Sequence, residues 1–343
     1  MVAQIDGAYL RAGVGRAARR LASYALFEGR PITTRGRWAN PLVFAWLRAL
    51  AALPGRPAVK APIFITGLGR SGTTILGLLL SLHREVGFLN EPKAIWSVID
   101  PRHDVNGNYS RGGGVFRMPP AWVDERTRVR AARLYARYLR LVGARRVVDK
   151  YPELIFRVDY LLSLFPDARV VLITRNGIDA CASIARWSRE KGVDRDGGRE
   201  DWWGREDCKW WRLWDELVVP DERLAALASR GTAGLDDVSR AAVEWVVTMR
   251  EGMAQVARHP GRVYRVRYED LVTDTARQLD ALLAFCGLWR DPAVYAYATR
   301  RLYRLPRRPL PALVAGLDAV FQETMADLGY GDLLARAQSA GAG

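Results

Sequence analysis

Residues 62–82 read PIFITGLGRSGTTILGLLLSL, an apolar run that enters a glycine-rich turn and continues directly into a helical pattern. Glycines at positions 67, 69 and 72 let the chain turn sharply. We expect the helix to begin at Ser71 or Gly72, with its backbone N–H groups pointing into the turn. Such a helix N-terminus binds anions through unpaired donors and the helix dipole. The stretch therefore predicts a phosphate-binding loop at the end of a strand.

The alternation of strand and helix patterns continues along the chain. Further apolar runs occur in EVGFLN, RRVVDK, ARVVLITR and RVYRVRYE, and helices are predicted to start at Pro152, Gly177 and Asp274. Continuous apolar strands joined through helices indicate a parallel sheet covered on both faces. We therefore predict an α/β fold with a P-loop-type parallel sheet flanked by helices over residues 61–343. The glycines at 112–114 and the segment DRDGGRED at 194–201 are predicted to be loops.

Residues 1–60 are predicted to be a helical N-terminal extension. Apolar residues at three-to-four spacing lie beside arginines in AYLRAGVGRAARRLASYALFEG and in NPLVFAWLRALAAL. This pattern allows two interpretations: packing on the main domain, or peripheral contact with an anionic membrane. The most apolar stretch, residues 41–53, is too short to span a bilayer and contains Arg48. We predict neither a signal peptide nor a transmembrane helix.

The charge balance favours an anionic partner. Lys and Arg outnumber Asp and Glu by 52 to 37, which gives a formal net charge of +15. A basic nucleic-acid-binding protein is one alternative, but the arginines are spread over the whole chain rather than clustered on a docking motif. The cysteines Cys181, Cys208 and Cys286 lie far apart, so neither a disulfide framework nor a metal site is predicted, and a cytoplasmic location is expected.

The glycine-rich turn departs from the loop of nucleotide triphosphatases. A Walker A loop needs a lysine that reaches the β and γ phosphates, and Thr73 stands in its place. The positive charge lies within the loop, at Arg70. This arrangement suits a single 5′-phosphate with a bound sulfonyl group better than a magnesium triphosphate. A P-loop kinase using ATP and magnesium remains the second enzyme hypothesis.

Three stretches, GRSGTT, ITRNGIDACAS and VRYEDL, resemble the landmarks of sulfotransferases that use 3′-phosphoadenosine-5′-phosphosulfate (PAPS). The resemblance runs over roughly residues 62–330 and makes residues 61–343 a sulfotransferase domain. It is greater to the tyrosylprotein and carbohydrate branch than to the phenol and steroid branch, where a lysine usually occupies the position of Arg70. It implies PAPS as the sulfonyl donor, and we expect no metal to be required.

The resemblance also implies a cofactor site. The loop part comprises Arg70, Ser71, Gly72, Thr73 and Thr74. Arg175 ends a strand and Ser183 follows eight residues later, a pair that holds the 3′-phosphate in the family. A guanidinium fork with a nearby hydroxyl suits phosphate oxygens. Tyr268 resembles a tyrosine near the adenosine, with a core aromatic as the alternative. Asn176 and Asp179 are predicted to cap the helix, and Glu269 and Asp270 to be structural.

Sulfonyl transfer needs a base for the acceptor proton and positive charge at the reacting oxygens. The resemblance assigns the base to Glu91, with pairing to Lys93 as the structural alternative. It places Lys150 near the sulfonyl oxygens, with an exposed strand-end lysine as the alternative. Arg70 is predicted to bind the 5′-phosphosulfate and to stabilise the leaving oxygen. His103, in the polar segment DPRHDVNGNYS, is a second candidate base and otherwise a solvated loop histidine.

The acceptor side is predicted from aromatic residues. Six of the 12 tryptophans lie between Trp187 and Trp214, interleaved with charged residues. Aromatic faces beside charged groups suit sugar rings or a lipid-linked glycan, and helix packing is the alternative. The basic segment RRLYRLPRRPL at 300–310 is predicted either to close over the nucleotide or to be a solvated turn. Together these features predict a cytoplasmic sulfotransferase that acts on a hydroxyl of a saccharide or glycolipid.

Overall fold

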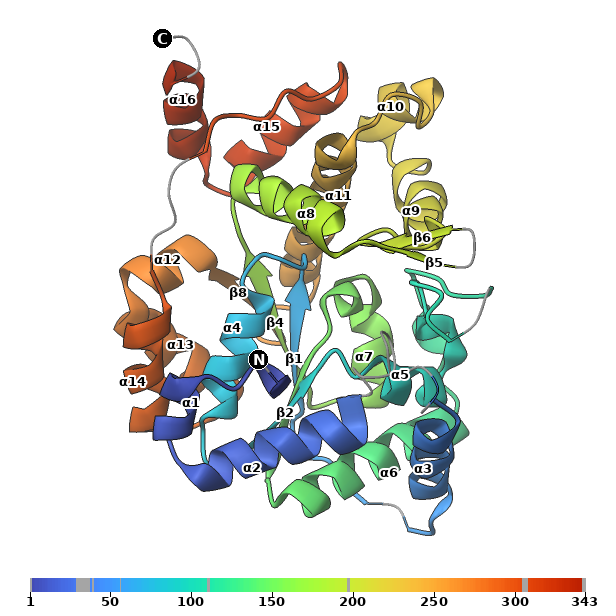
Figure 1. Cartoon of the computed structure of the whole chain (residues 1–343), viewed down its shortest axis with the longest axis vertical. Helices are drawn as coiled ribbons and strands as arrows, with labels where there is room; N and C mark the ends of the chain where they lie inside the picture. The colour runs from blue at the N-terminus through green and yellow to red at the C-terminus, as the bar shows by residue number, and fades with distance from the viewer. Residues whose placement is uncertain are drawn as a thin grey trace.

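The protein is described by a computed structural model over residues 2–28, 38, 40–55, 57–109, 112–195, 198–303 and 308–340. A five-stranded sheet runs through its centre (Figure 1), in the order β2-β3-β1-β4-β8 with every neighbouring pair parallel. Its strands are β1 (Ile63–Gly67), β2 (Val86–Asn90), β3 (Arg146–Lys150), β4 (Arg169–Thr174) and β8 (Val263–Arg267). The predicted α/β fold with a parallel sheet is confirmed.

Helices cover both faces of this sheet. One face packs against α1 (Gly7–Arg11), α2 (Val14–Ser23), α4 (Thr73–Ser81), α13 (Thr275–Cys286) and α14 (Pro292–Arg301). The other face packs against α3 (Asn40–Ala52), α5 (Lys93–Ile99), α6 (Glu125–Val142), α7 (Val158–Leu164), α8 (Gly177–Lys191), α11 (Asp237–Arg258) and α15 (Leu317–Asp327). The remaining helices are α9 (Cys208–Leu213), α10 (Ala225–Arg230), α12 (Tyr268–Thr273) and α16 (Gly331–Ala340). Burial on both faces explains why the central strands β1 and β4 are almost continuously apolar, whereas the edge strand β8 carries two arginines.

Several helices begin at other residues than the sequence predicts. Helix α4 begins at Thr73, one or two residues later than expected, because Gly72 adopts a left-handed conformation outside the helix. The helix expected at Pro152 begins as a 3-10 helix over Pro152–Arg157 and continues as α7. The helix expected at Asp274 begins at Thr275 and follows the separate helix α12.

The segment predicted to be a loop at 194–201 contains strands instead. Strand β5 (Val193–Arg195) pairs antiparallel with β6 (Gly198–Asp201), which pairs with β7 (Gly204–Arg205). The loop prediction for these residues is wrong. Their side chains are mostly charged and at least partly exposed, so the pairing depends on backbone hydrogen bonds that leave no apolar alternation in the sequence.

Helices α1 and α2 pack on the body of the protein. Tyr9 and Ala17 are buried in the same cluster as the strand residues. Arg16 donates to the Leu82 carbonyl at 2.6 Å, Arg19 donates to the Val142 carbonyl at 3.0 Å, and Arg20 pairs with Glu28. These contacts favour the packing interpretation for α2. Among the described residues, no helix is long and apolar enough to cross a membrane.

Candidate active site

All the predicted site segments follow the carboxyl ends of sheet strands. The glycine-rich loop (residues 67–72) follows β1, Glu91 follows β2, Lys150 ends β3, Arg175 follows β4 and Tyr268 follows β8. Parallel strands end at one edge of a sheet, which is where ligands of open α/β folds bind. The topology therefore brings together residues that are distant in sequence.

The glycine-rich loop presents unpaired donors. Gly72, at φ 95°, occupies the N-cap of α4 and supplies no side chain to the first N–H groups of that helix. A Cβ atom at Gly72 would lie 2.5 Å from Cδ2 of Tyr268, so the close approach requires glycine. The Ser71 hydroxyl is buried and has no hydrogen-bond partner in the described part of the chain. Unpaired amide and hydroxyl donors at a helix N-terminus form an anion site.

Two arginines extend this anion site. Arg175 Nη1 donates to the Arg70 carbonyl at 2.8 Å, and Arg70 Nε donates to Ser183 Oγ at 3.2 Å. The Arg175 guanidinium lies 5.1 Å from the centre of the Tyr268 ring. Burial, together with the charges of Arg175 and Arg186, lowers the pKa of Arg70, which marks a concentration of positive charge. The structure thus brings Arg70, Arg175, Ser183 and Tyr268 together.

The start of α8 is capped as predicted. Asn176 Oδ1 accepts from the Asp179 N–H at 2.9 Å, and Glu269 Oε1 accepts from the Asn176 N–H at 3.0 Å. Asp179 Oδ2 also lies 3.5 Å from Arg175 Nη2. The capping residues therefore help to hold Arg175, and the structural role expected for Glu269 is confirmed.

Glu91 and Lys150 form an ion pair at the ends of the adjacent strands β2 and β3. The Lys150 side chain is 1% exposed and that of Glu91 is 28% exposed. Glu91 adopts a left-handed φ of 53°, and its N–H donates to the Lys150 carbonyl at 2.7 Å. Lys93 instead donates to Asn106 Oδ1 at 3.1 Å. The pairing of Glu91 with Lys93, weighed as the structural alternative, is absent between these described side chains.

His103 is buried rather than solvated, so the loop interpretation of this residue is wrong. Its Nδ1 lies 2.8 Å from Arg157 Nη1, and its ring packs 4.6 Å from the Trp96 ring. Burial and the charge of Arg157 hold the pKa of His103 well below its usual value. The turn over residues 100–104 places the ring among aromatic side chains. His103 does not line the cavity beside Glu91 described below, which argues against its use as a base.

A cavity of about 810 Å³ lies beside the glycine-rich loop. Gly67, Gly69 and Glu91 line it together with Trp187 and Trp202. The Trp202 ring covers the loop so closely that a Cβ atom at Gly69 would lie 2.5 Å from it. The cavity therefore joins the anion site to an aromatic wall.

The tryptophans between 187 and 214 divide between the two predicted roles. Trp203, Trp210 and Trp214 are buried in the core around α11. Trp187 and Trp202 line the cavity, and their rings meet edge to face with centroids 5.5 Å apart. The packing interpretation is confirmed for the three buried tryptophans, whereas contact of Trp187 and Trp202 with an acceptor stays a prediction.

Sequence reasoning missed the contribution of the N-terminal segment. Ala3, Gln4 and Glu28 line the same cavity. The buried Glu28 carboxylate pairs with Arg20 and accepts from the Asn90 N–H at 2.8 Å, one residue before Glu91. Because these partners are separated by 62 residues, no local pattern could reveal the contact.

Part of the basic segment at 300–310 lies outside the described residues, since residues 304–307 are not described. The prediction that this segment closes over the nucleotide therefore stays a prediction. Of its described residues, Arg308 places Nε 3.6 Å from Asp179 Oδ1.

The fold and site define an α/β protein with a candidate anion site at the N-terminus of α4. The chain belongs to the sulfotransferase family, because the model of that family matches residues 62–228 and 221–292, more than half of its length.

The chain is also similar to individual proteins. It is 27% identical to the nodulation protein NoeE of Sinorhizobium fredii over 246 residues, 68% of this chain and 51% of that protein. It is 25% identical to an uncharacterized protein of Aquifex aeolicus over 264 residues, 72% of this chain and 28% of that protein. The chain thus spans about half or less of the length of these curated relatives.

Solved structures of sulfotransferases align with most of the chain at low identity. The sulfotransferase STF1 of Mycobacterium tuberculosis H37Rv aligns with a TM-score of 0.47 and 18% identity, covering 95% of this chain and 99% of STF1. Mouse SULT7A1, solved in complex with PAP, aligns with a TM-score of 0.36 and 13% identity, covering 85% of this chain and 88% of that chain.

Proposed function

We propose that this sulfotransferase transfers a sulfonyl group from PAPS to a hydroxyl of a saccharide or glycolipid, as enzymes of the carbohydrate branch do. One observation carries the proposal: a single cavity joins the glycine-rich loop and Glu91 to the aromatic side chains Trp187 and Trp202. Donor and acceptor must meet in one enclosed space for direct group transfer. A cytoplasmic location remains part of this proposal.

The residues present fit PAPS. Ser71 Oγ and Arg175 Nε are buried polar atoms without a hydrogen-bond partner among the described residues, and both belong to the predicted phosphate site. In the proposal the N–H groups at Thr73 and Thr74 hold the 5′-phosphosulfate, Arg175 and Ser183 hold the 3′-phosphate, and Tyr268 contacts the adenosine. Unpaired buried donors of this kind are costly unless a ligand satisfies them.

The proposed chemistry uses groups at the ends of three strands. When bound, PAPS supplies an activated sulfonyl group. Glu91 accepts the proton of the acceptor hydroxyl, since its carboxylate lines the cavity. The Lys150 ammonium, held beside Glu91, and the Arg70 guanidinium provide the positive charge that oxygen atoms of the reacting group require.

The acceptor assignment rests on the character of the cavity wall. Trp187 and Trp202 meet at an interplanar angle of 74°, which provides aromatic surface for the faces of sugar rings. Asn106, Asn108 and Glu200 line the same space and can exchange hydrogen bonds with hydroxyl groups. Aromatic surface combined with neutral and acidic hydrogen-bonding groups supports a saccharide acceptor.

The test measures transfer of label from ³⁵S-labelled PAPS to a panel of saccharides, glycolipids, phenols and tyrosine peptides. We expect product with saccharide or glycolipid acceptors. Glu91→Gln should leave the affinity for adenosine 3′,5′-bisphosphate unchanged and lower turnover by about 10²- to 10⁴-fold.

Glu153→Gln is the matched control, because Glu153 lines the same cavity without an assigned role. It should retain turnover within a few-fold. Full activity in Glu91→Gln, or equal losses in both variants, would remove Glu91 as the base. Transfer to phenols or peptides alone would reject the acceptor proposal.

A further inference from the structure

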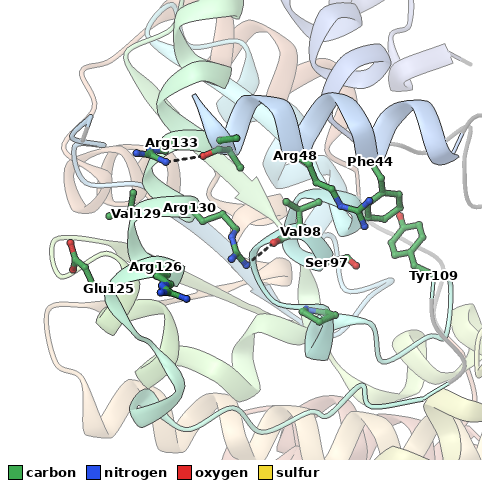
Figure 2. A pocket seen from close by; sticks show the side chains of 13 residues that line it. Phe44, Arg48, Ser97, Val98, Tyr109, Glu125, Arg126, Val129, Arg130 and Arg133 are labelled. Atoms are coloured by element: carbon green, nitrogen blue, oxygen red, sulfur yellow. Dashed lines mark hydrogen bonds between the residues drawn. The ribbon is translucent and has the colours of Figure 1, made fainter. Parts of the chain in front are cut away.

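A second cavity, of about 970 Å³, opens between α3, α5 and α6 (Figure 2). Four of the residues that line it are arginines: Arg48, Arg126, Arg130 and Arg133. Glu125 is the one acidic residue among its described lining residues, and it lies 3.3 Å from Arg128. The cavity therefore carries an excess of positive charge that the sulfotransferase site does not use.

Neutral partners hold two of these arginines. Arg130 Nη1 donates to the carbonyls of Val98 and Ile99 at 3.2 and 2.9 Å, and Arg133 donates to the carbonyls of Ala51 and Gly55 at 3.1 and 2.9 Å. Carbonyls at helix ends fix the side chains without cancelling their charge. Within the described ranges none of the four arginines forms an ion pair, so an anion is the missing partner.

Helix α3 borders this cavity with Phe44 and Arg48, and exposed apolar side chains lie on and just before the same helix, outside the cavity lining. Trp38 is 79% exposed, Leu42 is 68% exposed and Trp46 is 38% exposed. Leu42 and Trp46 are four residues apart and therefore lie on one side of α3. Arg48 and Phe44 of the same helix point toward the cavity in Figure 2. We call Trp38, Leu42 and Trp46 the α3 ridge.

We infer that this surface docks on an anionic membrane, with the α3 ridge in the interfacial layer and phosphate headgroups in the arginine cavity. Tryptophan and leucine beside arginines suit the boundary between headgroups and acyl chains. Charge complementarity selects anionic lipid over neutral lipid. The earlier membrane hypothesis for the N-terminal helices is thereby assigned to α3 and α6 rather than to α2, whose arginines contact the protein body.

The surface lies close to the catalytic cavity. Helix α5 begins two residues after Glu91 and ends at the arginine cavity, where Ser97 and Val98 line it. Its seven residues span about 10 Å. Docking would therefore hold the acceptor cavity near the lipid surface, although the inference does not depend on the identity of the acceptor.

The experiment uses the full chain and sedimentation with vesicles. One set contains phosphatidylcholine alone, and the other contains equal parts of phosphatidylcholine and phosphatidylglycerol. We expect binding to the anionic set only. The double variant Arg48→Glu with Arg126→Glu should weaken it by about 25-fold or more, since each arginine near an anionic surface contributes on the order of fivefold.

The matched control is Arg277→Glu with Arg290→Glu, which changes net charge equally. These arginines are 74% and 64% exposed, and Arg277 lies on α13, on the other side of the molecule from α3 in Figure 1. The control should retain most of the binding, whereas Leu42→Ser with Trp46→Ser should weaken it. All variants should bind adenosine 3′,5′-bisphosphate normally, which verifies folding.

Three results would overturn the inference: no binding of the wild-type chain to anionic vesicles, equal losses in the two charge-reversed variants, or self-association through the α3 ridge without vesicle binding. Inorganic phosphate bound at the cavity without vesicle binding would also reject a membrane partner. Sulfonyl transfer to a water-soluble acceptor is measured separately, so failure of the membrane inference leaves the proposed function intact.

Discussion

The role of Arg175 can be tested by comparing two ligands that differ in one phosphate. Arg175→Ala removes a guanidinium whose Nε is buried with no hydrogen-bond partner among the described residues and whose Nη1 donates to the Arg70 carbonyl at 2.8 Å. If the free donor binds the 3′-phosphate, adenosine 3′,5′-bisphosphate loses at least one charged hydrogen bond. Such a bond contributes roughly 1.5 to 3 kcal/mol, so its affinity should fall by about 10- to 150-fold.

The substitution also disturbs the glycine-rich loop, because Arg175 holds the Arg70 carbonyl. That disturbance weakens every ligand that uses the loop. Adenosine 5′-phosphate lacks the 3′-phosphate but shares the loop contacts, so the ratio of the two affinities isolates the 3′-phosphate contribution. We expect this ratio to change by about 10-fold or more.

Isothermal titration calorimetry measures both affinities directly. Arg189→Ala is the control, since Arg189 is an exposed arginine on the same helix α8, and it should leave the ratio unchanged. Arg175→Lys keeps the charge without the planar fork and should give an intermediate ratio. Equal losses of the two ligands in Arg175→Ala would remove Arg175 from the 3′-phosphate site and refute the reasoning.

Three further predictions concern the donor, the core and the N-terminal wall. Adenosine 3′,5′-bisphosphate should raise the melting temperature without magnesium, whereas a larger shift with ATP and magnesium would favour the kinase alternative. Burial raises the pKa of Asp149 to about 7 from 3.8. The folded chain therefore keeps this proton while the unfolded chain loses it, and stability should fall by up to roughly 4 kcal/mol between about pH 4 and pH 7. Asp149→Asn should remove this pH dependence of the unfolding free energy, measured by urea unfolding across that pH range. An unchanged pH dependence would contradict the role of Asp149. Glu28→Gln should cost about 3 to 5 kcal/mol of unfolding free energy by leaving buried Arg20 unpaired; a cost near zero rejects that pairing.

The sheet and the donor side of the site could be predicted from sequence because their signals are local. Each strand is a short run rich in apolar residues, and Glu91, Lys150 and Arg175 stand at or just after the end of one. Parallel pairing then places Lys150 beside Glu91 and Arg175 beside the glycine-rich loop without any further information. The spacing between Arg175, just after β4, and Ser183, on the following helix α8, is equally local.

The acceptor side could not be predicted because it depends on contacts between distant segments. Trp202 reaches Gly69 from a hairpin whose polar sequence resembles a loop. Glu28, from the N-terminal segment, contacts Asn90, and the buried side chains of Arg157 and His103 contact each other from segments that are distant in sequence. Each of these contacts depends on tertiary packing, and none of them produces a recognisable pattern among residues that are neighbours in sequence.

The positively charged side chains are concentrated in particular regions of the molecule, and this distribution bears on which kind of acceptor can bind. The donor loop gathers Arg70 and Arg175, and the cavity beside α3 gathers further arginines. The acceptor cavity differs, because the six carboxylates that line its described part are matched by four lining cationic side chains and by Arg20 and Lys150, which pair with Glu28 and Glu91. This part of the wall therefore has no excess of positive charge to attract a polyanion. A net charge of +15 therefore does not imply a polyanionic acceptor. The uncharged hydroxyl groups of the proposed saccharide acceptor are compatible with such a wall.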